Sequence, residues 1–258
     1  MNKLSVAIIT FNEERHIGRC IDSVLPVADE VIVLDSHSTD NTCAIAVAKG
    51  ARVVQQTFAG YIEQKNDALA LAQYDLVLSL DADEALDERL QQSILAAKKS
   101  NLAAGYTMNR CTYYCGRFIR HGAWYPDRKL RLFNKQLAKW GGTNPHDKVE
   151  FHTPQPTTHL AGDILHYSYY SLEEHITQNN KFSTISAESY FSRGKRTNLF
   201  RICFNPCWAF FSGFILRGGF LDGFYGYVIA RNVAHLTFLK HSKLYLMQRK
   251  AAADKKGV

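Results

Sequence analysis

The decisive stretch of this chain reads Leu76-Val77-Leu78-Ser79-Leu80-Asp81-Ala82-Asp83-Glu84, an apolar run that ends in acids. On an extended strand, side chains two residues apart point the same way, so Asp81 and Asp83 can present two carboxylates to one ligand. Their oxygens suit a hard divalent cation, Mg²⁺ or Mn²⁺, which in turn suits a diphosphate. A D-x-D triplet is common by chance, so the rest of the chain must support this interpretation.

Strand and helix patterns alternate on both sides of that stretch. We expect strands at 4–10, 30–34, 51–55 and 75–80, and helices at 14–24, 40–49, 61–72 and 87–99. Such alternation predicts βαβ units and a mostly parallel sheet with flanking helices. Ligands of these sheets bind beyond the carboxyl ends of the strands. Three polar clusters fall at such ends: Thr10-Phe11-Asn12, Asp35-Ser36 and Asp81-Ala82-Asp83.

The pattern changes after residue 105. Short strands are expected at 106–110, 129–134, 148–152 and 164–168, as additions that complete the sheet and wall the site. Ser171 is predicted to cap a helix that runs to about Phe191, and two apolar helices follow near 199–216 and 221–239. We therefore expect a catalytic domain over residues 1–192 and a helical extension over 193–258.

Charge is unevenly distributed over the 258 residues. The net charge is +7, and residues 193–258 carry 12 Lys or Arg against Asp222 and Asp254, which leaves residues 1–192 at −3. This charge distribution, little net charge in the body and a basic, aromatic tail, predicts a soluble catalytic part joined to a surface-binding part. A hydrophobic content of 46% allows a large core.

The six cysteines and the apolar segments point to the cytoplasm. The two C-x3-C pairs lack zinc-finger spacing, so reduced thiols are expected. No secretion signal is visible near the start. The longest uncharged run, 202–216, contains Pro206, and we expect it to be too short and too broken to span a bilayer.

Four motifs together resemble the family 2 glycosyltransferases of the GT-A fold. They read A-I-I-T-F-N-E-E, V-I-V-L-D-S-H-S-T-D-N-T, Q-K-N-D-A-L and L-S-L-D-A-D-E, within residues 4–152. R-L-F-N-K, W-G-G-T-N-P-H-D-K-V and G-G-F-L-D-G-F-Y-G further resemble bacterial lipopolysaccharide-core β-glycosyltransferases. The resemblance implies a divalent metal and transfer of a hexose with inversion, with glucose from UDP-glucose as the expected donor.

The resemblance also suggests roles for the residues that bind the donor. Asp83 would be a direct metal ligand, and Asp81 would hold the ribose or a metal-bound water. Asp35 would meet the base edge, although Asp also favours turns. Further donor contacts are expected from Thr10, Phe11, Asn12, Glu13, Lys65 and Arg131. Asn12 can equally cap a helix, and Lys65 can equally be a surface lysine paired with an acid.

Asp147 is the candidate catalytic base. An inverting transfer needs a group that takes the proton from the acceptor hydroxyl. In the narrower group a His is followed by an acid, usually Glu, whereas this chain has His146 followed by Asp147, which is one methylene shorter. Asp127 and Glu150 are rivals for the role.

The expected partners are a nucleotide-sugar donor and a glycolipid or saccharide acceptor. The basic, aromatic tail favours peripheral association with an anionic membrane at the inner face of the cytoplasmic membrane. Packing of the tail on the catalytic domain and a homodimer contact are the alternatives, and nucleic acid is not expected. Two rival functions are nucleotidyl transfer, which usually needs a Gly-rich basic loop, and sugar-nucleotide binding without turnover.

Overall fold

The computed structural model describes residues 2–143 and 146–254. The chain forms two compact units. The first comprises the residues up to 111 together with 126–167, and the second comprises 112–125 together with 168 onward. The predicted boundary at 192/193 lies inside the second unit, and as a division between catalytic part and extension it stays a prediction.

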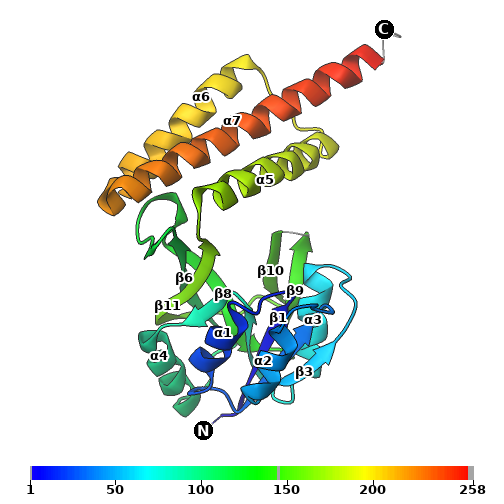
Figure 1. The fold of residues 1–258 in the computed structure, drawn as a ribbon, viewed down its shortest axis with the longest axis vertical. Coiled ribbons are helices and arrows are strands. Elements are labelled where there is room, and N and C mark those ends of the chain that lie inside the picture. Colours follow the sequence, from blue (N-terminus) through cyan, green and yellow to red (C-terminus); the bar gives the residue numbers. More distant parts are fainter. Residues whose placement is uncertain (1, 144–145, 255–258) are drawn as a thin grey trace. The chain divides into compact units, whose positions relative to one another are not determined.

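The first unit is built on a mixed sheet (Figure 1). Its strand order is β3-β2-β1-β4-β8-β6-β11-β5. The parallel strands are β1 (Leu4–Thr10), β2 (Glu30–Asp35), β3 (Arg52–Gln55) and β4 (Leu76–Asp81). The others are β5 (Glu84–Leu86), β6 (Gly105–Tyr114), β8 (Asp127–Asn134) and β11 (Thr157–Tyr169), with antiparallel pairing of β4 to β8, β8 to β6 and β11 to β5. The GT-A sheet is thus confirmed.

Two apolar layers cover this sheet because its strands alternate their side chains between the faces. Leu4, Val6 and Ile8 of β1 pack in a core with α1 (Ile17–Val24) and α4 (Glu88–Lys99), and this core also includes Ala46 of α2 (Thr42–Ala48). Ala7 and Ile9 pack in a second core with α3 (Tyr61–Leu71). The second core also holds Trp140 of the hairpin formed by β9 (Ala138–Thr143) and β10 (His146–Phe151), a separate two-stranded sheet.

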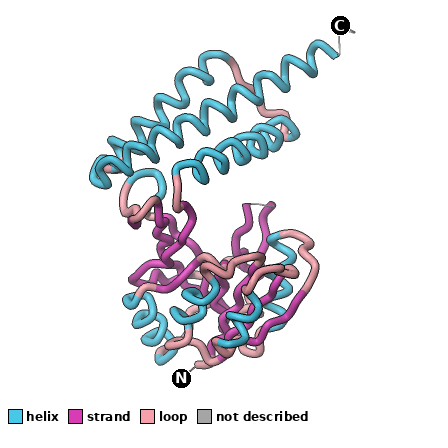
Figure 2. Tube along the Cα trace, viewed as in Figure 1, coloured by secondary structure: helices cyan, strands magenta, loops and turns pink. Residues whose placement is uncertain are grey.

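The second unit is mostly helical, as the cyan segments of Figure 2 show. It contains α5 (Leu172–Ser192), α6 (Leu199–Phe211) and α7 (Gly223–Asp254), and α7 packs against both others. Two short helices, Ser212–Leu216 and Gly219–Asp222, join α6 to α7. Ser171 caps α5 as predicted, in a reciprocal capping box with Glu174. The last helix was predicted to end near Leu239, but α7 continues to Asp254.

The apolar helix α6 contains no buried residue. Its exposed aromatic and aliphatic side chains include Leu199, Phe200, Phe204, Trp208 and Phe211. The stretch Leu199–Leu216 is long and apolar enough to cross a membrane by length and composition alone. The run 202–216 was expected to be too short and too broken to span a bilayer, but α6 continues through Pro206 and the stretch is long enough.

A buried acid fixes the loop 117–125 within the second unit. Asp222 is 2% exposed, and its Oδ2 accepts hydrogen bonds from the backbone N–H groups of Arg120 (3.1 Å) and His121 (2.8 Å). The loop itself contains β7 (Arg117–Phe118) and the short helix Gly122–Trp124. Gly219 and Gly226 permit close backbone contact here, since a Cβ on Gly226 would lie 1.8 Å from Gly219 O. These contacts give the G-G-F-L-D-G-F-Y-G motif a structural role.

Candidate active site

Backbone hydrogen bonds join the three polar clusters at the carboxyl ends of β1, β2 and β4. Thr10 lies opposite Asp35 and Ile9 lies opposite Asp81 in the parallel ladder. Beyond these pairs, Ser36 N donates to Thr10 O (2.9 Å) and Ala82 N donates to Ile9 O (3.2 Å). The predicted convergence of the clusters on one sheet edge is therefore present.

Asp35 is fully buried and held by its own loop. Its carboxylate accepts hydrogen bonds from Ser38 N (2.8 Å), from the Ser38 hydroxyl and from Gln55 Nε2 (3.0 Å). Burial raises the pKa of the Asp35 carboxyl, but these donors outweigh burial and lower its pKa below the ordinary value. Asp35 is thus an ionised acceptor. The alternative turn role is present, because Ser38 N donates to Asp35 at turn spacing, and the base-binding role stays a prediction.

The loop after β1 contributes one buried hydroxyl and several exposed groups. Thr10 is 5% exposed, and its Oγ1 has no hydrogen-bond partner among the described residues. Phe11 is 56% exposed. Asn12 does not cap α1, whose N-cap is His16; instead, it has a φ of 53° and its Oδ1 accepts from Thr39 N (2.9 Å). Glu13 pairs with His16 Nδ1 at 2.5 Å.

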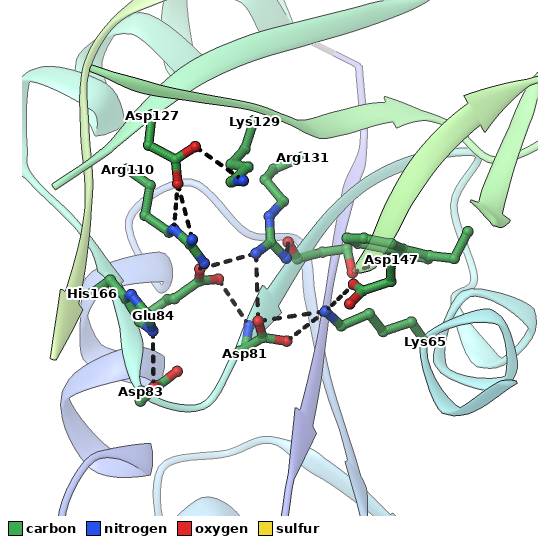
Figure 3. A network of polar contacts seen from close by, with 12 residues as sticks. Lys65, Asp81, Asp83, Glu84, Arg110, Asp127, Lys129, Arg131, Asp147 and His166 are labelled. Carbon is green, nitrogen blue, oxygen red and sulfur yellow. Dashed lines mark hydrogen bonds and ion pairs between the residues drawn. The ribbon is translucent and has the colours of Figure 1, made fainter. Parts of the chain in front are cut away.

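Asp81 lies between two buried cations (Figure 3). Lys65 Nζ is 3.0 Å from its Oδ1, and Arg131 Nη2 is 3.4 Å from its Oδ2. Burial raises the pKa of the Asp81 carboxyl, but Lys65 and Arg131 outweigh burial and lower its pKa well below the usual range. Lys65, at 3% exposure, is therefore not the surface lysine that was the alternative.

Glu84 carries the charge network further into the sheet. It is 0% exposed, its Oε2 accepts from Asp81 N (3.0 Å), and its Oε1 lies 3.0 Å from Arg131 Nη2. Arg110 Nη1 lies 3.7 Å from the same oxygen. The carboxylate thus ties the acidic turn to β8 and β6. The sequence showed Glu84 only as the acid after the triplet, with no local signal for these partners.

Asp83 faces a histidine that was not assigned to the site. His166 Nε2 lies 3.1 Å from Asp83 Oδ2. Backbone pairing brings the two together: His166 is opposite Glu84 in the β11–β5 ladder, and Tyr167 N donates to Asp83 O (2.9 Å). We expected a strand at 164–168, which includes His166. His166 does lie on a strand, and that strand delivers its ring to Asp83.

Asp147 reaches the network from the β9–β10 hairpin. Its Oδ2 lies 2.7 Å from Lys65 Nζ, so one ammonium joins the candidate base to Asp81. Of the rivals, Asp127 pairs with Arg110 (2.9 Å) and Lys129 (3.0 Å), and Glu150 pairs with Lys148 (3.0 Å). Asp147 is the one of the three that contacts Lys65. The side chain of His146 lies outside the described residues.

The acids of the turn fit a divalent cation. Asp81 Oδ1 is buried and, despite its ion pair with Lys65, accepts no hydrogen bond from a described residue. Asp83 and His166 offer an oxygen and a nitrogen at one point. Among the described residues, no group of three or more His, Cys, Asp or Glu could hold a metal. A cation would therefore need further oxygens, which a diphosphate and water can supply.

The mixed sheet, with its acids at the carboxyl ends of parallel strands, is the GT-A architecture of glycosyltransferases. The chain belongs to glycosyl transferase family 2, whose model matches residues 5–155.

Relatives match nearly the whole chain. An uncharacterized glycosyltransferase of Rickettsia felis is 36% identical over 95% of this chain and 90% of its own length. The lipopolysaccharide core biosynthesis glycosyltransferase LpsC of Rhizobium meliloti is 30% identical over 94% and 92%, respectively. Among solved structures, glucosyl-3-phosphoglycerate synthase from Mycobacterium tuberculosis is similar over 45% of this chain and 44% of that chain, with 30% identity and a TM-score of 0.36. The narrower resemblance to lipopolysaccharide-core enzymes is thus supported by a named relative.

Proposed function

We propose that this glycosyltransferase moves a hexose, with inversion, from a uridine diphosphate donor to a lipopolysaccharide-core or other glycolipid acceptor. The observation that carries the proposal is the pair of contacts Asp81–Lys65 and Lys65–Asp147 at the carboxyl edge of the sheet, with Asp83–His166 as a separate pair in the same acidic turn. The proposed diphosphate-binding turn and the proposed base thus contact the same ammonium.

The proposed base is Asp147. The acceptor hydroxyl oxygen attacks the anomeric carbon from the face opposite the diphosphate, and its proton passes to the Asp147 carboxylate. The bond from the anomeric carbon to the diphosphate oxygen breaks, and its electron pair leaves with the nucleoside diphosphate. Lys65 contacts Asp147 directly and holds this carboxylate beside the acidic turn.

The support for uridine comes from Asp35. An ionised carboxylate only accepts hydrogen bonds, so it can pair with an exocyclic amino group or with a ring N–H, and we propose a ring N–H. Uracil and guanine have one, whereas cytosine and adenine present a ring acceptor at the equivalent edge. Uracil carries a carbonyl on each side of its N–H, and we propose that the Gln55 amide, which donates to Asp35 Oδ2 and Cys43 Sγ, turns from Cys43 to donate to one of them. The hexose itself is proposed as glucose on the family resemblance.

Asp83 and His166 are the residues proposed to hold Mg²⁺ or Mn²⁺, with Asp81 behind them toward the ribose or a metal-bound water. When bound, the cation would neutralise negative charge on the departing diphosphate. Arg131 keeps the turn in place through Asp81 and Glu84, and Thr10, Phe11, Asn12 and Glu13 line the proposed base and ribose side.

The acceptor is proposed to be presented at the inner face of the cytoplasmic membrane. LpsC supports a lipopolysaccharide-core acceptor. The exposed aromatic side chains of α6, with Arg193, Lys195 and Arg196 just before it, support peripheral binding to anionic lipid. A homodimer contact through the same helix is the competing occupant of this surface.

The test is transfer by purified protein across a panel of nucleotide sugars, with acceptor glycolipid and with Mg²⁺, Mn²⁺ or chelator. We expect UDP-glucose to be used, product with inverted anomeric configuration, and loss of activity with chelator. Nucleotide binding without turnover would favour the inactive binding protein, and release of pyrophosphate from a nucleoside triphosphate would favour nucleotidyl transfer. Either outcome would overturn the proposed function.

A further inference from the structure

The side chain of Asn66 on α3 binds the backbone of the hairpin that carries Asp147. Asn66 Nδ2 donates to Trp140 O and Trp140 N donates to Asn66 Oδ1, both at 2.9 Å. The carboxamide thus satisfies both backbone groups of Trp140, as a neighbouring strand would.

The anchor lies close to the candidate base in the hairpin register. Trp140 pairs with Val149, and Asp147 pairs with Gly142, two residue pairs along the ladder. At the strand rise, this separates Asp147 from the anchored pair by about 7 Å. The hairpin is short, so a shift at Trp140 would carry Asp147 with it.

The Trp140 side chain fixes the same point from the other side. Its ring is 3% exposed, its Nε1 donates to Ser79 Oγ on β4 (3.2 Å), and Lys65 Nζ lies 4.4 Å from the ring centroid. Trp140 is therefore held between α3 and β4, the strand that ends in Asp81.

The three residues of the Q-K-N motif have separate partners. Gln64 Nε2 donates to Ser36 Oγ (2.6 Å) at the end of β2, Lys65 joins Asp81 to Asp147, and Asn66 holds Trp140. One turn of α3 thus contacts Ser36 after β2, Asp81 at the end of β4, and the β9–β10 hairpin, and it sets the position of these three parts relative to one another.

We propose that Asn66 is a positioning residue: by pairing with the Trp140 backbone, it sets the position of Asp147 relative to the Asp81 end of β4. The inference rests on the proposed function of Asp147 as the base. Asn66 acts through the hairpin and makes no contact with the reacting atoms.

The experiment compares Asn66→Ala with Gln91→Ala in the full chain. Gln91 Nε2 donates to Ser23 O (2.9 Å), so its truncation removes a similar carboxamide contact on α4. We expect Asn66→Ala to lower kcat by about 10²-fold, because an error of about 1 Å in position has that cost. The donor KM and the affinity for UDP should stay within about twofold. Gln91→Ala should leave kcat, the donor KM and the affinity for UDP unchanged.

A double mutant decides whether Asn66 acts through Asp147. In an Asp147→Asn background, Asn66→Ala should have almost no further effect on kcat, because the two residues form one unit. A second loss as large as the first would overturn the proposal. Asn66→Asp keeps the acceptor for Trp140 N but sets a carboxylate oxygen against Trp140 O, so it should lower kcat at least as much as Asn66→Ala.

Amide hydrogen exchange separates this inference from the proposed function. Faster exchange in residues 138–143 and 146–151 of Asn66→Ala, together with a lower kcat, supports positioning. Unchanged exchange overturns it, whatever the activity, and so does faster exchange with full activity. If Asp147→Asn were fully active, the assignment of the base would fail, while the exchange result would still decide whether Asn66 holds the hairpin.

Discussion

The two units distribute polar and apolar side chains in opposite ways. The first buries charges, with Lys65, Glu84 and Arg131 at no more than 4% exposure, and pairs each of them. The second leaves apolar groups outside, with Phe200 at 69% and Phe204 at 50% exposure. Buried charge lowers stability unless it is paired, and large exposed apolar patches usually mark binding surfaces. The contrast supports the two proposals made above, chemistry in the first unit and membrane contact through α6 in the second.

The largest expected effect is on the buried network. Asp147→Asn should lower kcat by about 10³-fold, because it removes the proposed proton acceptor while keeping the shape. Steady-state transfer assays measure this. Glu150→Gln, a rival on the same hairpin, is the control and should retain wild-type kcat. If the two results were exchanged, the base would be Glu150.

Lys65→Met should destabilise the first unit. It leaves Asp81 and Asp147 without their shared cation, and removal of one partner from a buried ion pair costs about 3–5 kcal/mol. Urea unfolding of the full chain measures the loss. The exposed pair Lys148–Glu150 provides the control, since Lys148→Met should cost less than about 1 kcal/mol. Equal losses would show that burial of the pair is unimportant.

His166→Ala should raise the Mg²⁺ or Mn²⁺ concentration that gives half-maximal activity by about 10–100-fold. The reason is the loss of the proposed nitrogen ligand beside Asp83. Metal titration of UDP binding by calorimetry gives a second readout. His159→Ala on the same strand is the control, because His159 contacts Thr107 instead. Unchanged metal dependence in His166→Ala would remove this residue from the site.

Acidic pH should destabilise the second unit through His175. Burial lowers the pKa of His175 from 6.5 to about 4, so the unfolded chain binds the proton more readily. The contribution of neutral His175 to the free energy of unfolding is therefore fully present above pH 6.5. It decreases as the pH falls from 6.5 toward 4, and about 2 kcal/mol is lost at pH 5. Thermal unfolding from pH 7 to 5 measures this. His175→Gln should show a smaller dependence on pH, and an equal dependence would contradict the assignment.

The smallest effect is expected at α6. Phe204→Ser should weaken binding to vesicles with anionic lipid by about tenfold, since only the exposed half of the ring is available for burial. Flotation measures this. Phe58→Ser, at a comparably exposed aromatic outside α6, should bind like the wild type. If Phe204→Ser instead changed the molecular mass in solution, the surface would be a contact between copies of the chain.

Local sequence signals predicted much of this architecture. The acids after apolar runs marked the strand ends, and Ser171 followed by Glu174 marked a helix start. The contact between Asp83 and His166 had no such signal, because a ladder between β5 and β11 creates it. The predicted helix end near Leu239 was wrong. In α7, the run Ala251–Ala253 favours continuation of the helix.

The β5–β11 ladder has a consequence for how the chain can change in length. Because His166 reaches Asp83 through its pairing with Glu84, one residue inserted within 157–165 would bring Leu165 opposite Glu84. The strand would then present its other face, and an aliphatic side chain would replace the imidazole. Insertions should therefore be excluded from β11 and tolerated in the exposed segment 152–156, so natural length variation in this part of the chain should fall before Thr157.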